Sequence, residues 1–181
     1  MDAFAILATG IWAMLPAYIP NNVAVLAGGG APIDGGRIWR GARLLGDGKT
    51  WRGTAVGISA GVLLAWILNA MQAQAAALIG VPVPSFSFGA MLALPTGALL
   101  GDITASFLKR RTGRERGSAF PLVDQLDFLV VSLALTVLVD PGWFFAVFTL
   151  PVLAVVVVLT PVLHLLTNAI AYWLGLKNEP W

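Results

Sequence analysis

The sequence predicts an all-α polytopic membrane protein with five transmembrane helices. Hydrophobic residues make up 58% of its 181 residues, and the mean hydropathy is +0.84. Charged residues make up only 11% and fall mainly in two segments, residues 34–52 and 101–127. Long apolar runs separated by short loops are typical of a membrane bundle rather than a soluble domain. We therefore expect one transmembrane domain over residues 1–181.

The first two spans are expected at residues 3–19 and 54–79. The first could be mistaken for a signal peptide, but Asp2 stands where a basic residue is usual and no cleavage site precedes Pro20. It is therefore interpreted as a retained helix. The second carries Gly57 and Gly61 in a GxxxG pair, which permits close contact with a neighbouring helix.

The third and fourth spans are expected at residues 86–108 and 122–139. Pro95 is expected to loosen or kink the third. The uncharged connection at residues 81–85 is a turn on the side opposite the basic loops. The Asp-Pro-Gly sequence at residues 140–142 ends the fourth span in a strong turn signal.

The last apolar stretch, residues 143–174, is too long for a simple crossing. At about 1.5 Å per residue it exceeds a hydrocarbon core of roughly 30 Å. Pro151 and Pro161 offer two places at which it can bend or break. The preferred interpretation is one bent, tilted span with a cytoplasmic extension, and the alternative is a span followed by a surface helix.

The Lys and Arg residues orient these spans. They lie at residues 37–52, at residues 109–116 and at Lys177, whereas the connections at residues 81–85 and 140–142 carry none. The positive-inside rule then places the amino terminus outside, and both charged loops and the carboxyl terminus in the cytoplasm. We expect a multi-pass protein of the cell membrane with its charged site on the cytoplasmic side. A topology signal also explains the net charge of +2 without a nucleic-acid partner.

The lack of cysteine and the scarcity of histidine exclude several kinds of catalytic and metal site. The chain has no cysteine, which excludes disulfides, thiolate-bound metals and thiol nucleophiles. It has a single histidine, His164, so a histidine-rich metal site is also excluded.

Aspartates in the second charged segment predict a metal site. Asp102, Ser106 and Lys109 are spaced by four and three residues, so they share one face of a helix. Asp124 and Asp127 share a face of the next helix, which should be an antiparallel neighbour. Three converging carboxylates repel one another unless a cation lies between them, and oxygen-only ligation favours Mg²⁺. The sequence therefore predicts that Asp102, Asp124 and Asp127 hold Mg²⁺.

Structural roles stay open for several polar residues. Asp124 can cap the fourth helix while Asp127 pairs with an arginine. Asp34 can order its own loop, because the acidic motif of CDP-alcohol phosphotransferases is not met around it. His164 can hydrogen-bond within the bundle, and Asn21 can either cap a helix or touch substrate.

The first charged segment ends in a glycine loop, residues 46–53, that leads into the second span. Its Gly48-Lys49-Thr50 sequence resembles a phosphate-binding P-loop, but position 43 is Arg rather than Gly and no strand is expected before it. Glycines still expose backbone N–H groups, Lys49 supplies charge, and a helix amino terminus attracts an anion. Gly48, Lys49, Thr50 and Arg52 are therefore candidates for binding nucleotide phosphate, and contact with lipid headgroups is the alternative.

The two charged segments together resemble the phosphatidate cytidylyltransferases, a family of membrane CTP transferases. The resemblance is carried by Ser106-Phe107-Leu108-Lys109-Arg110, Pro121 and Asp124-Gln125-Leu126-Asp127. The chain departs from that pattern in three ways: Glu115-Arg116 replaces Lys-Asp, no His-Gly-Gly follows Pro121, and Gln125 replaces Arg. In these three departures the chain resembles instead the archaeal branch of the family, the CDP-archaeol synthases. Its small size, its glycine loop and residues 15–18 and 32–34 carry the same resemblance.

The resemblance implies a Mg²⁺-dependent nucleotidyltransferase. CTP and an unsaturated archaeal ether lipid phosphate, 2,3-bis-O-geranylgeranyl-sn-glycerol 1-phosphate, would give CDP-archaeol and pyrophosphate in membrane phospholipid biosynthesis. No protein nucleophile is required. The expected catalytic residues are Asp102, Lys109, Asp124 and Asp127, and the expected nucleotide-binding residues are Gly48, Lys49, Thr50, Arg52, Ser106 and Arg110.

Two other functions are compatible with these features. A CTP-dependent polyprenol kinase would use similar loops but transfer the γ-phosphoryl group. A non-catalytic lipid transporter or scaffold is the alternative from another class. A transporter predicts inverted repeats around a midplane site, whereas no such repeat is evident and the charges gather on one side. The oligomeric state is left open.

Overall fold

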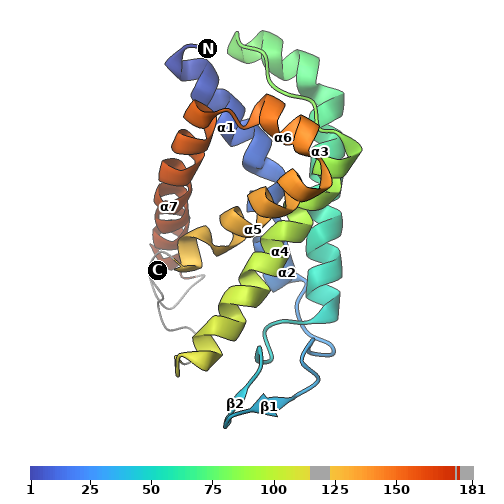
Figure 1. Ribbon diagram of the computed structural model, residues 1–181, viewed down its shortest axis with the longest axis vertical. Helices are drawn as coiled ribbons and strands as arrows, with labels where there is room; N and C mark the ends of the chain where they lie inside the picture. Colours follow the sequence, from blue (N-terminus) through green and yellow to red (C-terminus); the bar gives the residue numbers. More distant parts are fainter. Residues whose placement is uncertain (115–122, 174, 176–181) are drawn as a thin grey trace.

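The computed structural model describes residues 1–114, 123–173 and 175, and within them the regular secondary structure is helical apart from one small hairpin and an isolated bridge between Pro32 and Thr50 (Figure 1). The helices are α1 (Ala3–Tyr18), α2 (Pro20–Leu26), α3 (Trp51–Ile79), α4 (Phe88–Arg111), α5 (Val123–Val139), α6 (Pro141–Val147) and α7 (Leu150–Trp173). The hairpin pairs β1 (Ile38–Trp39) with β2 (Ala42–Arg43) in antiparallel register. It lies at the end of the molecule opposite the amino terminus. Glu115, Arg116, Pro121 and Lys177, which entered the sequence argument, lie outside the described residues.

Four stretches of the described chain are long and apolar enough to cross a membrane. They are Ala3–Leu26, Trp51–Ile79, Phe88–Arg111 and Leu150–Thr167. A helical, multi-pass membrane protein is thereby confirmed. The remaining expected span corresponds to α5, which has only 17 residues, so five crossings and their orientation stay predictions.

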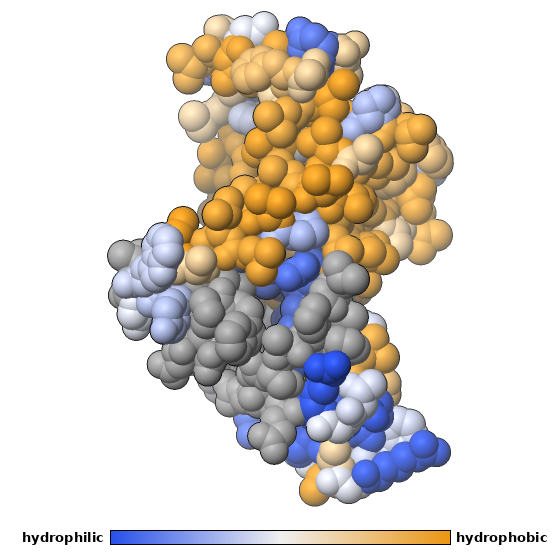
Figure 2. Space-filling model, turned by 90° about the vertical axis from the view of Figure 1, so that its left-hand side faces the viewer, coloured by the Kyte–Doolittle hydropathy of each residue, from blue (hydrophilic) through white to orange (hydrophobic). Residues whose placement is uncertain are grey.

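The surface agrees with a membrane environment. Figure 2 shows a broad hydrophobic surface over the middle of the molecule, with hydrophilic residues gathered toward the end that carries the hairpin. Large apolar side chains are exposed along α3 and α7, among them Leu63, Trp66, Val158 and Leu166. An apolar surface this extensive is uncommon on soluble monomers and suits contact with lipid.

The first apolar segment continues beyond the range expected from the sequence. Ile19 separates α1 from α2, and Pro20 is the first residue of α2, where a missing backbone N–H costs nothing. The seven residues of α2 extend along α3 and reach the charged end of the molecule. This extension matters because α2 forms one wall of the site described below.

The last apolar stretch is divided into two helices just before Pro151, one of the two places at which a break was expected. Residues 148 and 149 separate α6 from α7. Pro151 falls in the first turn of α7, where proline is tolerated, and α7 continues through Pro161. The start of α6 is fixed by Asp140, whose Oδ1 accepts from Trp143 N at 3.0 Å. The described chain therefore has a short helix before the long one, which differs from both interpretations drawn from the sequence.

Glycines let three segments of the bundle meet closely. A Cβ on Gly57 would lie 2.7 Å from Pro20 O, and one on Gly61 would lie 2.4 Å from Pro95 Cβ. The close helix contact predicted for the Gly57/Gly61 pair is therefore confirmed. It brings α3 against both α4 and the junction of α1 with α2.

A second glycine pair, which the sequence analysis did not single out, lies between α4 and α5. A Cβ on Gly97 would lie 2.5 Å from Ser132 Cα, and one on Gly101 would lie 2.4 Å from Asp127 O. Ser132 Oγ also donates to Leu94 O at 3.0 Å. The two backbones are in direct contact, and this contact sets the approach of α5 to the charged end of α4.

Candidate active site

A polar cleft lies between α2, the glycine loop and the charged end of α4. Its volume is about 410 Å³, within the range of roughly 300–1,000 Å³ that is usual for small-molecule sites. It brings together the two charged segments that are far apart in the sequence. Its lining consists of Ala24, Val25, Gly28, Gly29, Leu45, Asp47, Gly48, Lys49, Asp102, Ser106, Lys109 and Arg110.

Two ion pairs connect the elements around this cleft. Lys49 Nζ lies 2.5 Å from Asp102 Oδ2 and joins the glycine loop to α4. Lys109 Nζ lies 2.7 Å from Asp124 Oδ1 and joins α4 to α5. All four side chains are partly buried, so these pairs are less screened by solvent than pairs on an open surface.

Asp127 lies one turn beyond Asp124 on α5, where Gly101 of α4 touches its backbone. Its Oδ1 accepts from the backbone N of Phe128 at 2.6 Å. No arginine of the described chain forms an ion pair with it.

These carboxylates fit a hard metal ion in their chemistry, although they do not form a ready-made cage. Within the described ranges, no three His, Cys, Asp or Glu side chains are placed to hold an ion by themselves. Mg²⁺, however, is usually bound through one or two carboxylates, waters and substrate phosphates. Asp102 and Asp127 supply carboxylates of this kind from two helices that are in contact at Gly101. The full set of Asp102, Asp124 and Asp127 stays a prediction.

Two of the expected phosphate-binding residues contact the protein instead of the cleft. Thr50 Oγ1 accepts from Gly53 N at 3.1 Å and caps the first turn of α3. The Arg52 guanidinium donates to Ala27 O at 2.9 Å and to Gly28 O, at the carboxyl end of α2. Neither residue lines the polar cleft.

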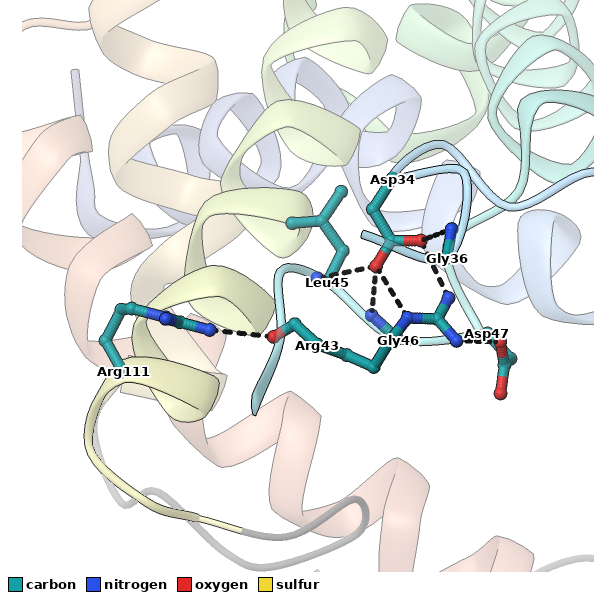
Figure 3. Close-up of polar contacts among 7 residues, drawn as sticks. All are labelled: Asp34, Gly36, Arg43, Leu45, Gly46, Asp47 and Arg111. Atoms are coloured by element: carbon teal, nitrogen blue, oxygen red, sulfur yellow. Dashed lines mark hydrogen bonds and ion pairs between the residues drawn. The ribbon is translucent and has the colours of Figure 1, made fainter. Parts of the chain in front are cut away.

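Asp34 organises the loop that carries one wall of the cleft (Figure 3). Its side chain is fully buried, and its Oδ1 and Oδ2 accept from Arg43 Nη2 at 2.7 Å and Nε at 3.2 Å. It also accepts from the backbone N–H groups of Gly36, Leu45 and Gly46. The Arg43 guanidinium, aided by these amides, holds the pKa of the Asp34 carboxyl well below its usual range. The loop-ordering role that the sequence left open for Asp34 is confirmed.

The hairpin is an element that the sequence analysis missed, and its second strand stands before the glycine loop, where no strand was expected. Arg40 and Gly41 form its turn with φ of +52° and +80°, the geometry of a two-residue type I′ connection. Arg111 of α4 holds it in place by donating to Trp39 O at 2.5 Å and to Arg43 O at 2.9 Å. The signal in the sequence was a single Arg-Gly pair, which is too common to predict a hairpin.

The chain was compared with known proteins. A family model described as CarS-like, CDP-archaeol synthase, matches residues 3–181. A CDP-archaeol synthase of Halorubrum lacusprofundi is 66% identical over 177 residues and covers 98% of both chains. One of Halobacterium salinarum is 65% identical over 181 residues, which is 100% of both chains.

A more distant relative and a solved structure agree with these matches. A CDP-archaeol synthase of Methanospirillum hungatei is 51% identical over 169 residues, covering 93% of this chain and 100% of its own. The solved structure, described as an intramembrane enzyme for archaeal membrane lipid biosynthesis, superposes with a TM-score of 0.69. It shares 39% sequence identity and covers 87% of this chain and 91% of its own.

Proposed function

The chain belongs to the CDP-archaeol synthase family of nucleotidyltransferases, and we propose that its polar cleft is where CTP reacts with the lipid phosphate. The observation that carries this proposal is the meeting of Lys49, Asp102 and Lys109 in one cleft of an apolar helical bundle. The proposed acceptor is 2,3-bis-O-geranylgeranyl-sn-glycerol 1-phosphate, the products are CDP-archaeol and pyrophosphate, and the reaction takes place on the cytoplasmic side.

The charges of the cleft support a metal-dependent reaction with a polyphosphate. Its lining carries three cationic side chains, Lys49, Lys109 and Arg110, against two carboxylates, Asp47 and Asp102. That small excess does not balance the several negative charges of a triphosphate. Mg²⁺, held by Asp102 and Asp127 with Asp124 beside them, would supply the missing positive charge and stabilise the pyrophosphate as it leaves.

The side chains of the cleft perform the binding and positioning. Lys49, Lys109 and Arg110 bind the triphosphate, while Gly48 lets the backbone approach it next to the amino terminus of α3. An oxygen of the lipid phosphate then attacks the α-phosphorus in line. The new O–P bond forms as the bond from the α-phosphorus to the bridging oxygen of the β-phosphate breaks. Catalysis of this kind depends on alignment and on stabilisation of charge, and it needs no protein nucleophile.

The wall formed by α2 supports a lipid as the second substrate. Val25 lines the cleft and is 80% exposed, and the neighbouring Leu26 is 87% exposed. Exposed apolar side chains directly beside a charged cleft suit a substrate that has a phosphate headgroup and hydrocarbon chains. The headgroup would enter the cleft while the chains remain against the apolar surface.

Incubation of the purified protein with Mg²⁺, the lipid phosphate and CTP labelled at either the α- or the γ-phosphorus tests this function. We expect the α-label in the lipid product and the γ-label in pyrophosphate. In a parallel incubation with a polyprenol, transfer of the γ-label to its hydroxyl oxygen, with release of CDP, would instead identify a polyprenol kinase. A lack of label in any lipid, with archaeal and bacterial lipid phosphates all supplied, would leave only the non-catalytic alternative.

A further inference from the structure

Asn21, in the first turn of α2, carries a buried polar atom that the bundle leaves unsatisfied. Its Oδ1 has no hydrogen-bond partner among residues 1–114, 123–173 and 175. The neighbouring Asn22 differs, because it is exposed and its Nδ2 donates to Tyr18 O at 3.3 Å. Burying an unpaired acceptor destabilises a protein, so such atoms in native structures commonly mark a place where a ligand, ion or water binds.

The Asn21 side chain lines a small floor pocket that continues the polar cleft inward between α2, α3 and α4. This pocket, of about 20 Å³, is also lined by Thr50, Leu99 and Asp102. It shares Ala24, Val25, Gly48, Lys49 and Asp102 with the larger cleft. A volume of this size accommodates a single occupant as large as a water molecule, which needs roughly 10–15 Å³.

Two other polar side chains around the floor pocket, Thr50 and Lys49, already have partners. Thr50 Oγ1 accepts from Gly53 N at 3.1 Å. Lys49 Nζ donates to Asp102 Oδ2 at 2.5 Å. A single small occupant would therefore meet a neutral amide oxygen from α2 and a carboxylate from α4. Hard divalent cations and their bound waters prefer this combination of oxygen ligands.

We infer that Asn21 Oδ1 and the Asp102 carboxylate together bind a divalent cation, directly or through one of its waters, at the floor of the cleft. This inference rests on the proposed function and extends the predicted metal ligands from α4 and α5 to α2. It also gives α2 a role in the reaction, since the helix that forms the lipid-facing wall would help to fix the ion beside the nucleotide phosphates.

Binding of Mn²⁺ in place of Mg²⁺ to the full-length protein without nucleotide, followed by electron paramagnetic resonance, tests the inference. Asn21→Leu keeps the branched shape of the side chain but removes the oxygen, and we expect it to weaken Mn²⁺ binding by about 10-fold or more. Asn21→Asp should bind Mn²⁺ at least as tightly as the unaltered protein. Asn22→Ala, the matched control, should leave the affinity unchanged. Without metal, Asn21→Leu should unfold at the same or a higher temperature, because it removes an unsatisfied acceptor.

Unchanged Mn²⁺ affinity in Asn21→Leu would overturn the inference. So would a failure of the unaltered protein to bind Mn²⁺, or an equal loss of Mn²⁺ affinity in Asn22→Ala. Should Asn21→Leu fail to fold, Asn21→Asp decides the matter, because weaker binding by that variant contradicts a ligand role. Cytidylyl transfer is measured in parallel. CDP-lipid formation together with unchanged Mn²⁺ affinity in Asn21→Leu would refute only this inference, whereas no CDP-lipid from the unaltered protein would refute the proposed function.

Discussion

At the scale of single residues, Lys49 and Lys109 carry most of the argument for phosphate binding. Each ammonium group lies within hydrogen-bond distance of a carboxylate, Asp102 or Asp124, and both lysines line the polar cleft. Phosphate oxygens make the same kind of charge-assisted hydrogen bond as carboxylates. The lysines can therefore bind the triphosphate from positions that the two aspartates already hold in place.

Lys49→Ala should raise the KM for CTP by about 10-fold or more, equivalent to about 1.4 kcal/mol of binding free energy. The reason is that the variant loses a cation from the cleft wall and leaves the Asp102 carboxylate uncompensated. Steady-state kinetics with varied CTP measure this. Arg37→Ala, which removes an exposed cation outside the cleft, is the control. Equal KM values for Lys49→Ala and Arg37→Ala would argue against phosphate binding by Lys49.

The stability of the loop that Asp34 orders should fall only when the pH is lowered into the acid range. A carboxyl whose pKa is lowered by folding stabilises the folded state above its unfolded pKa of about 3.9, and this stability is lost as the pH falls through the folded pKa. Because the Asp34 pKa is lowered, protection of the Leu45 and Gly46 amides from hydrogen exchange should be constant from neutral pH to about pH 5. Protection should decline only in stronger acid.

Two variants separate Asp34 from its neighbours in the same exchange experiment. Asp34→Asn should lower the protection of both amides from neutral pH to about pH 5, because it leaves the Arg43 guanidinium without its buried carboxylate. Asp47→Asn should have little effect, because the Asp47 side chain is 76% exposed and its pair with Arg43 is a surface pair. Protection that already falls between pH 7 and pH 5 would show that another group controls the loop.

The spacing of residues could be read from the sequence more reliably than their individual partners. The helical face of Asp102, Ser106 and Lys109 was predicted from spacing, and the structure places all three along the cleft. The position of Arg52 could not be predicted in this way. Its partners are carbonyl groups at the end of α2. The sequence analysis ended the first span at residue 19 and did not predict α2.

At the scale of secondary-structure elements, the contact between α4 and α5 positions the carboxylates. Gly97 and Gly101 remove the side chains that would otherwise separate the two helices, so Asp102 follows directly after a point of backbone contact with Asp127. The sequence contains these glycines, but it does not show which helix they face. Packing contacts of this kind are fixed by tertiary structure, and this explains why the pair was not predicted.

Gly101→Ala should separate α4 from α5 and destabilise the protein by about 1–3 kcal/mol. The added Cβ would lie 2.4 Å from Asp127 O, and the atom it meets is backbone, which cannot turn away. Thermal unfolding in detergent measures the loss of stability. Gly142→Ala is the matched control, because its Cβ would have nothing closer than 3.8 Å. An unchanged unfolding temperature for Gly101→Ala would contradict the close contact.

At the scale of the whole molecule, the helical membrane architecture was predictable because apolar length and charge asymmetry are direct properties of the sequence. The break before α7 lies next to Pro151, one of the two places at which the sequence allowed a break, whereas α7 continues through Pro161. The hairpin could not be predicted, because its two strands have only two residues each and it depends on Arg111, which is about 70 positions distant in the chain.

The orientation can be tested cleanly because the chain has no cysteine. Single cysteines introduced at Val81 or Gly142 should react with a membrane-impermeant maleimide on intact cells. Cysteines at Arg37 or Arg114 should react only after permeabilisation. Reaction of positions 37 and 114 from opposite sides would contradict a shared cytoplasmic site. Reaction of positions 114 and 142 from the same side would show that α5 does not cross the membrane.

The central claim, that cytidylyl transfer takes place at the cleft beside the contact between Gly101 of α4 and Asp127 of α5, is tested most directly by Asp127→Asn. The measurement is transfer of label from the α-phosphorus of CTP to the lipid phosphate by purified protein in the presence of Mg²⁺. The control is Asp140→Asn. The Asp140 carboxylate accepts a hydrogen bond from Ser87 and so joins the start of α6 to the opposite end of α4. We expect Asp127→Asn to insert into the membrane normally and lose turnover, while Asp140→Asn retains it. Substantial transfer by a correctly inserted Asp127→Asn variant would contradict the claim.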